Sequence, residues 1–144
     1  QGDVYVDNSV SLSGGSIDTI NGAVGVGTWN TQAQFDDVLV TDGSTVLFSD
    51  SFSSGSSNWT VIDGSFSVSS GVYVQSGSQQ PAWSIENTAF NEQTLVYTLR
   101  ARKTGGAEAF LIPFGYENST NYYCFNIGGW GNTKHVIENC VNCS

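Results

Sequence analysis

Hydrophobic and polar residues alternate along this chain in short segments, and Gly, Ser, Asn and Asp separate the segments. These turn residues recur at intervals of roughly eight to twelve residues, which is the spacing of strands in an all-β sandwich. No segment repeats apolar residues with the helical period over three turns, so we expect no long helix. The pattern predicts strands at 4–6, 23–26, 34–40, 45–48, 59–62, 65–68, 72–75, 95–102, 108–114, 122–127 and 134–137.

The last third of the chain carries the clearest strands. Segments 95–102 and 108–114 are joined by KTGGA, and 108–114 and 122–127 by GYENSTN, two turn-rich stretches that predict hairpins. In the third segment the side chains alternate between two faces. Tyr122, Cys124 and Asn126 share one of these faces. Polar groups and aromatic rings therefore stand together on that side of the predicted sheet.

Length and charge narrow the classes of partner. The 144 residues fit a single domain, and a hydrophobic content of 39% is too high for a disordered acidic tail. A formal net charge of -9 disfavours nucleic acid and anionic membrane surfaces as partners. No apolar run reaches the roughly eighteen residues of a membrane span, so we expect no membrane insertion.

Three cysteines and three glycosylation sequons point to a secreted protein. Cys124 lies in an aromatic run, and Cys140 and Cys143 form the pair CVNC. A structural disulfide of Cys124 with Cys140 or Cys143 is expected, and the thiol left over could bond to another chain. The sequons begin at Asn58, Asn118 and Asn142, which act as acceptors only in a secretory pathway.

Residues 95–139 resemble a known family. The stretches RARKTGGAEAFLI and NYYCFNIGGWGNTKHVIE combine turn, strand and loop residues of the concanavalin-like (laminin-G-like) β-sandwich module attached to α-L-arabinofuranosidases and related glycoside hydrolases. Upstream, LFSDSFSSGSSNWTVIDGSFSVSSGVYVQ is similar to the opening strands of the same module. The resemblance implies an all-β, jelly-roll antiparallel β-sandwich without the catalytic barrel of those enzymes.

The segments stand in a permuted order. GAVGVGTWNTQAQFDDVLVTDG is similar to the closing strands of the module, yet it precedes the opening strands. We therefore expect one sandwich over residues 1–144, with 1–43 resembling the closing strands and 46–139 the opening and middle strands. About thirty residues of a family member have no counterpart here, by ordinary strand and loop lengths. A circular permutation, excision from a tandem array, or a homopolymer in which neighbours exchange strands would each explain this order.

The segment FNIGGWGNTKH is the first candidate for a binding site. Sugar recognition needs an aromatic face for the C–H side of the ring and polar groups for the hydroxyls. Trp130 stands among glycines that let a ligand approach the backbone, and Trp83 in QQPAWSIEN is a second stacking candidate. Trp29, by contrast, is expected in the core. The candidate carbohydrate-binding residues are Trp130, Asn126, Asn132, Tyr122, Arg100, Arg102, Glu108 and Trp83.

The carboxylates suggest two further chemistries. Asp36, Asp37 and Asp50 lie in strands that pair in concanavalin-like modules, and such oxygens suit Ca²⁺. Alternatively, these residues only keep a sheet edge soluble. Hydrolysis would need two carboxyl groups facing each other across a cleft, and no spacing of Glu residues identifies such a pair.

Together these observations predict a secreted, extracellular, non-catalytic module that binds a polysaccharide. One alternative is a structural subunit of an extracellular glycosylated filament assembled by strand exchange. Another is a glycoside hydrolase.

Overall fold

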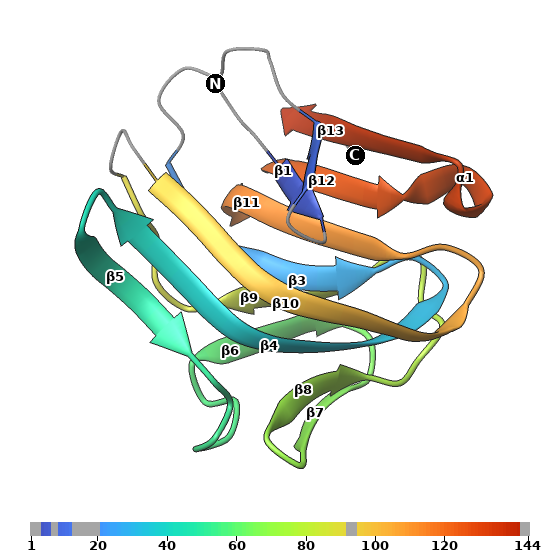
Figure 1. Ribbon diagram of the computed structural model, residues 1–144, viewed down its shortest axis with the longest axis horizontal. Coiled ribbons are helices and arrows are strands. Elements are labelled where there is room, and N and C mark those ends of the chain that lie inside the picture. Colours follow the sequence, from blue (N-terminus) through green and yellow to red (C-terminus); the bar gives the residue numbers. More distant parts are fainter. Residues whose placement is uncertain (1–3, 7–8, 13–20, 92–94, 142–144) are drawn as a thin grey trace.

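Two antiparallel sheets packed face to face form the body of this chain, as Figure 1 shows. The computed structural model describes residues 4–6, 9–12, 21–91 and 95–141. One sheet has the strand order β10-β4-β8-β7, with β5 also paired to β4; the other has the order β13-β12-β11-β3-β9-β6. We call them the five-stranded and the six-stranded sheet. The predicted all-β antiparallel sandwich is confirmed.

The strands are short and follow one another along the whole chain. Their bounds are β1 Val4–Val6, β2 Ser9–Leu12, β3 Gly25–Thr28, β4 Thr31–Asp42, β5 Thr45–Asp50, β6 Trp59–Asp63, β7 Phe66–Ser69, β8 Val72–Gln75, β9 Ala82–Glu86, β10 Leu95–Gly106, β11 Phe110–Asn118, β12 Asn121–Gly128 and β13 Lys134–Val141. A single four-residue helical turn, α1 Gly129–Asn132, joins β12 to β13 within the described part of the chain. Strands β2 and β9 were not predicted, and β3 begins two residues later than expected.

The segments resembling closing strands lie at the centre of both sheets. Strand β3 sits between β11 and β9, and β4 sits between β10 and the pair β5 and β8 (Figure 1). Strand β4 also pairs with β5 along a tight hairpin, with Val38 opposite Asp50. The early strands are therefore integral to the sandwich. The family-based division at residue 43 stays a prediction.

A bulge in β4 explains how its hydrophobic residues reach the core. Leu39 pairs with Thr98 and Asp36 with Arg100, so β4 carries one more residue than β10 at this point. Asp37 adopts a positive φ of 47° there and is exposed. The extra residue resets the alternation. As a result Phe35 and Val38, three positions apart, are both buried.

The core between the sheets is centred on aromatic rings. The rings of Phe52 and Tyr73 stack with centroids 4.8 Å apart, and Trp59 lies 5.5 Å from Phe52. The polar atoms of these rings are paired: Tyr73 Oη lies 2.7 Å from Ser84 Oγ, and Trp59 Nε1 donates to Asp50 Oδ2 at 2.8 Å. Buried aromatic residues bring large apolar area as well as directional partners.

The proposed calcium ligands are engaged in structural contacts. Asp50 uses its second oxygen, Oδ1, to accept a hydrogen bond from the Phe52 N–H at 2.7 Å. Asp37 forms an exposed ion pair with Arg100 at 3.5 Å. Asp36 Oδ1 accepts from the Asp37 N–H. Within the described residues no group of three His, Cys, Asp or Glu side chains could hold a metal ion, so the predicted cluster of Asp36, Asp37 and Asp50 does not form.

The cysteine prediction is wrong for Cys124. This residue is a buried free thiol on β12, and burial raises its pKa. Its neighbours come from β11 and β13, with Pro113 and Glu138 as its register partners. Cys140 is disulfide-bonded. Cys143 and the sequon residue Asn142 lie outside the described part of the chain, whereas Asn58 and Asn118 are exposed.

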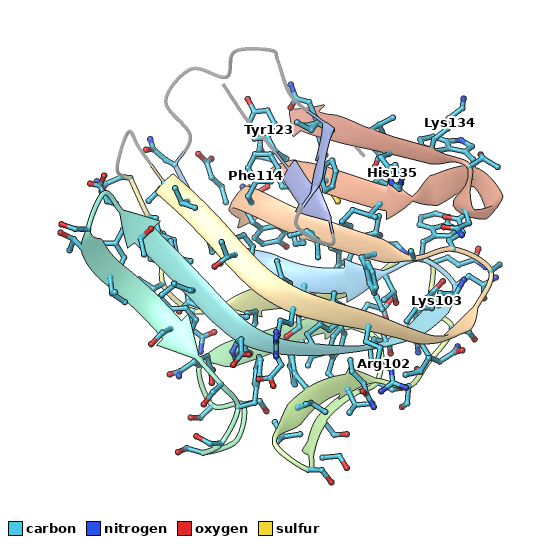
Figure 2. All side chains as sticks on the ribbon, in the orientation of Figure 1. Arg102, Lys103, Phe114, Tyr123, Lys134 and His135 are labelled. Carbon is cyan, nitrogen blue, oxygen red and sulfur yellow. The ribbon has the colours of Figure 1, made fainter. Side chains whose placement is uncertain are left out.

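The outer strands bear on assembly. Among the described strands, β10 ends the five-stranded sheet and carries Arg100, Arg102 and Lys103, three of the chain's four Lys and Arg residues. Figure 2 shows Arg102 and Lys103 on this strand. Charged side chains on an edge strand disfavour pairing with a second chain. Polymerisation by strand exchange stays a prediction.

No helix in the described residues is long and apolar enough to span a bilayer.

Glu86 gives the fold a pH dependence that can be measured. Its side chain is 2% exposed, and burial raises its pKa, opposed by hydrogen bonds from Thr88 and Asn87. Because the folded-state pKa exceeds the unfolded one, stability falls as pH rises through the folded value. The Glu86→Gln variant should not lose stability in this way. Its free energy of unfolding should exceed that of the wild type above the folded-state pKa of Glu86 and approach the wild-type value in acid.

Urea denaturation at a series of pH values measures this effect. Glu117→Gln, at an exposed position of β11, is the matched control and should reproduce the wild-type pH profile. An unchanged pH slope in Glu86→Gln would show that the Glu86 carboxyl is not the group responsible.

Candidate functional site

The outer face of the six-stranded sheet carries a hollow of about 400 Å³. Register places Trp83, Gly27, Leu111 and Asn126 in one row across β9, β3, β11 and β12. The alternate residues of β11 and β12, such as Ile112 and Phe125, belong to the core. The row therefore faces away from the second sheet. The residues that line the hollow are Trp29, Pro81, Trp83, Glu108, Leu111, Tyr122, Asn126, Trp130 and Glu138.

Two glycines of β3 lie where neighbouring strands and side chains approach the backbone closely. A Cβ on Gly27 would collide with the carbonyl oxygen of Ala82 and lie 3.3 Å from Cε3 of Trp83. A Cβ on Gly25 would lie 2.7 Å from both Ile85 Cδ1 and Pro113 Cγ. Only a residue without a side chain fits at either position. The glycines of β3 thus let neighbouring side chains close over the backbone.

Gly27→Ala tests this close approach of β9 to β3. The new methyl group must push β9 from β3 and shift the Trp83 ring, so the variant should lose stability by about 1–3 kcal/mol, as overpacked sites do. Urea denaturation measures the loss. Val46→Ala, at a position 58% exposed, is the control and should stay within about 0.5 kcal/mol of the wild type. A stability equal to wild type in Gly27→Ala would refute the close approach.

Aromatic contacts hold the rings along one side of the hollow. Trp83 meets Tyr122 edge to face with centroids 5.5 Å apart, and Tyr122 stacks on Tyr116 at 5.9 Å. Burial raises the pKa of Tyr122, and the nearby Cys124 and Glu138 raise it further. Tyr122 therefore keeps its phenolic proton at neutral pH. Its hydroxyl can donate to or accept from a ligand.

The rim next to Trp29 is tied together by Thr31. This buried hydroxyl donates to the Trp29 carbonyl at 2.8 Å and accepts from the Glu108 N–H at 2.9 Å. The bonds join the β3–β4 turn to the segment before β11. Trp29 is 39% exposed and lines the hollow, so its predicted place in the core is wrong.

The α1 turn, which carries Trp130, forms another part of the rim. Trp130 and Gly131 both adopt left-handed dihedrals, with φ of 52° and 70°. Thr133 Oγ1 donates to the Trp130 carbonyl at 2.8 Å, and Glu108 Oε1 accepts from the Gly131 N–H at 3.1 Å. Lys134 Nζ lies 5.5 Å from the centroid of the Trp130 ring. These contacts present the indole with 53% of its surface exposed.

The structure gathers most, but not all, of the predicted site residues. Five of them line the hollow: Trp130, Asn126, Tyr122, Glu108 and Trp83. Asn132 belongs to the adjacent α1 turn and is exposed. Arg100 and Arg102 lie instead on the five-stranded sheet, at a depression of about 110 Å³. They were grouped with the site because β10 precedes β11 in sequence, but these two strands belong to different sheets.

Four lining residues were not predicted as part of the site: Trp29, Pro81, Leu111 and Glu138. Glu138 stands opposite Cys124 and thus on the same face as Tyr122 and Asn126. Strand alternation alone could have placed it there. Trp29 and Pro81 reach the hollow only through the pairing of β3 with β9, which sequence periodicity does not reveal.

The fold and the hollow define a small β-sandwich with an aromatic-lined, acidic site on the outer face of one sheet. Over 144 aligned residues, the chain is 38% identical to an extracellular exo-α-L-arabinofuranosidase of Streptomyces chartreusis. The match covers 98% of this chain but only 17% of the relative's length. The chain thus corresponds to a small part of an extracellular glycoside hydrolase. No protein-family profile and no solved structure matches the chain.

Proposed function

We propose that this chain is a secreted, non-catalytic module that binds polysaccharide in the hollow. The observation that carries the proposal is the meeting of four aromatic side chains with amide and carboxylate groups on one surface. Trp29, Trp83, Tyr122 and Trp130 offer apolar ring surface, and Asn126, Glu108 and Glu138 offer polar atoms for hydroxyl groups. The similarity to part of an extracellular glycosidase supports both carbohydrate as ligand and secretion.

The dimensions of the site favour a chain of sugars over a single ring. The hollow follows β12 from Tyr122 to the α1 turn that begins after Gly128. At about 3.3 Å per residue this stretch of strand is about 20 Å long. Several consecutive sugar rings fit along it, and the interior of a polysaccharide is the natural ligand of such an open surface.

Carboxylate placement argues against hydrolysis. A glycosidase needs an acid with a raised pKa across the cleft from a second carboxylate. Burial raises the pKa of Glu86, but this residue follows Ile85 on β9 and faces the interior of the sandwich near Tyr97, away from the hollow. Of the carboxylates at the hollow, Glu138 is exposed and Glu108 accepts a hydrogen bond from the α1 backbone.

Affinity electrophoresis in gels containing arabinan, xylan or β-glucan tests the proposal. At least one polymer should retard the folded protein relative to a gel without polysaccharide, and no reducing sugar should be released. Retardation by none of the three would overturn the proposal of carbohydrate binding. Release of reducing ends that is lost in Glu108→Gln or Glu138→Gln would instead establish a hydrolase.

A further inference from the structure

The charged side chains that line the hollow are of one sign. Among the described residues that line it, Glu108 and Glu138 are the ionisable acids, and none is Lys, Arg or His. Glu108 contributes its Oε1 to the Gly131 N–H, and Glu138 lies beside Tyr122 and Cys124. The hollow is therefore a concave surface with two negative groups and four aromatic rings.

The nearest ammonium group, that of Lys134, lies against the Trp130 ring at the edge of the hollow. His135 Nδ1 accepts a hydrogen bond from the Gly128 N–H at 3.1 Å. Both Lys134 and His135 lie at the α1 end of β13 in Figure 2, where Arg102 and Lys103 appear on the separate strand β10. Arg100 pairs with Asp37 on that same sheet. No guanidinium in the described residues faces the hollow to form the bidentate contact that carboxylate recognition favours.

We infer that the hollow selects uncharged polysaccharide and excludes chains that carry carboxylate groups, such as those of uronic acids. This inference rests on the proposed function and specifies its ligand class. A sugar carboxylate in the hollow would stand near Glu108 and Glu138 in a partly desolvated space, where the repulsion of two like charges outweighs the attraction of the single Lys134 ammonium over the Trp130 ring. Hydroxyl groups meet no such penalty because Glu and Asn oxygens accept from them.

Two derivatives of one polymer distinguish the effect of the ligand's charge on binding from the effect of its shape. The polymer that retards the protein is converted into carboxymethyl and hydroxyethyl forms of equal substitution, which differ in charge but little in size. In a low-salt buffer the wild type should bind the hydroxyethyl form about as well as the parent polymer and the carboxymethyl form at least about tenfold more weakly. Salt should narrow the difference, since the Debye length shortens from about 10 Å at 0.1 M to about 3 Å at 1 M.

A pair of double variants locates the origin of the exclusion. Glu108→Gln with Glu138→Gln should cut the discrimination to less than about threefold. Asp42→Asn with Asp63→Asn removes the same two charges from the net of -9 but lies outside the hollow, so it should keep the wild-type discrimination. An equal fall in the discrimination between the two polymer forms in both double variants would assign the effect to the whole chain's charge. That result would overturn the inference.

Two other outcomes bear on the inference in different ways. Equal binding of the carboxymethyl and hydroxyethyl forms by the wild type would overturn the charge selection while leaving carbohydrate binding in place. Retardation by none of the unmodified polymers would remove the proposed function and the selectivity with it.

Discussion

Replacing Trp83 by alanine is expected to weaken binding to the retarding polysaccharide by about 30-fold. Trp83 is the best-supported ring of the hollow: it is half-buried, it meets Tyr122 edge to face, and it lies over Gly27. Aromatic anchors in partly desolvated sites contribute about 2 kcal/mol or more to binding, and each 1.4 kcal/mol corresponds to a tenfold change in affinity. Dissociation constants from affinity gels at graded polymer concentration measure the loss.

Two variants make the Trp83 result specific. Arg102→Ala removes a polar side chain from the outer face of the five-stranded sheet and should bind as the wild type does. Trp83→Phe keeps a ring and should lose less affinity than Trp83→Ala. Circular dichroism confirms that each variant is folded before its affinity is compared. Wild-type affinity in Trp83→Ala would place the ligand elsewhere on the molecule.

Trp130 is expected to contribute less than Trp83, because its ring stands on a turn with more than half of its surface exposed. The sequence had ranked the two in the opposite order, since glycines around Trp130 indicate accessibility. Accessibility and anchoring are different properties. A ring fixed by a second ring and by the strand beneath it loses less conformational freedom on binding than a ring on a turn.

Strands with clean alternation could be predicted from the sequence, and strands with interrupted alternation could not. The pattern of 122–127 identifies both faces of β12, and Phe125 and Asn126 lie on them as expected. Strand β9 was missed because only five residues separate Pro81 from Asn87, each of which favours a turn. Its strand character comes from pairing with β3 and β6, which are distant in sequence.

The site could be predicted only where it depends on neighbours in sequence. Asn126 and Trp130 are four positions apart in the sequence, and alternation places Tyr122 on the same face as Asn126. Glu108 joins them because β11 pairs with β12. The error over Arg100 and Arg102 has a physical origin: the connection from β10 to β11 crosses from one sheet to the other, and turn chemistry alone does not distinguish such a crossing from a hairpin within one sheet.

Phe52→Ala should destabilise the fold by about 3–5 kcal/mol, the usual cost of removing a fully buried Phe side chain. Phe52 is 0% exposed and stacks on Tyr73 at 4.8 Å, in contact with Trp59. Its N–H bond to Asp50 keeps the backbone at a φ of 54°, so the cavity cannot collapse easily around an alanine. A domain of total stability about 5–15 kcal/mol would lose a large fraction of it.

Urea denaturation at constant m-value measures this loss, with Val46→Ala on the exposed part of β5 as the control that changes stability by less than about 0.5 kcal/mol. A cost below about 1 kcal/mol would show that the rings around Phe52 repack. Because Phe52 lies between the sheets and the hollow on an outer face, the folded fraction of Phe52→Ala should retain polysaccharide affinity. Stability and binding should thus respond to different variants. Phe52→Ala should lower stability, and Trp83→Ala should mainly lower polysaccharide affinity. Gly27→Ala, at the position next to the Trp83 ring, should lower both stability and affinity.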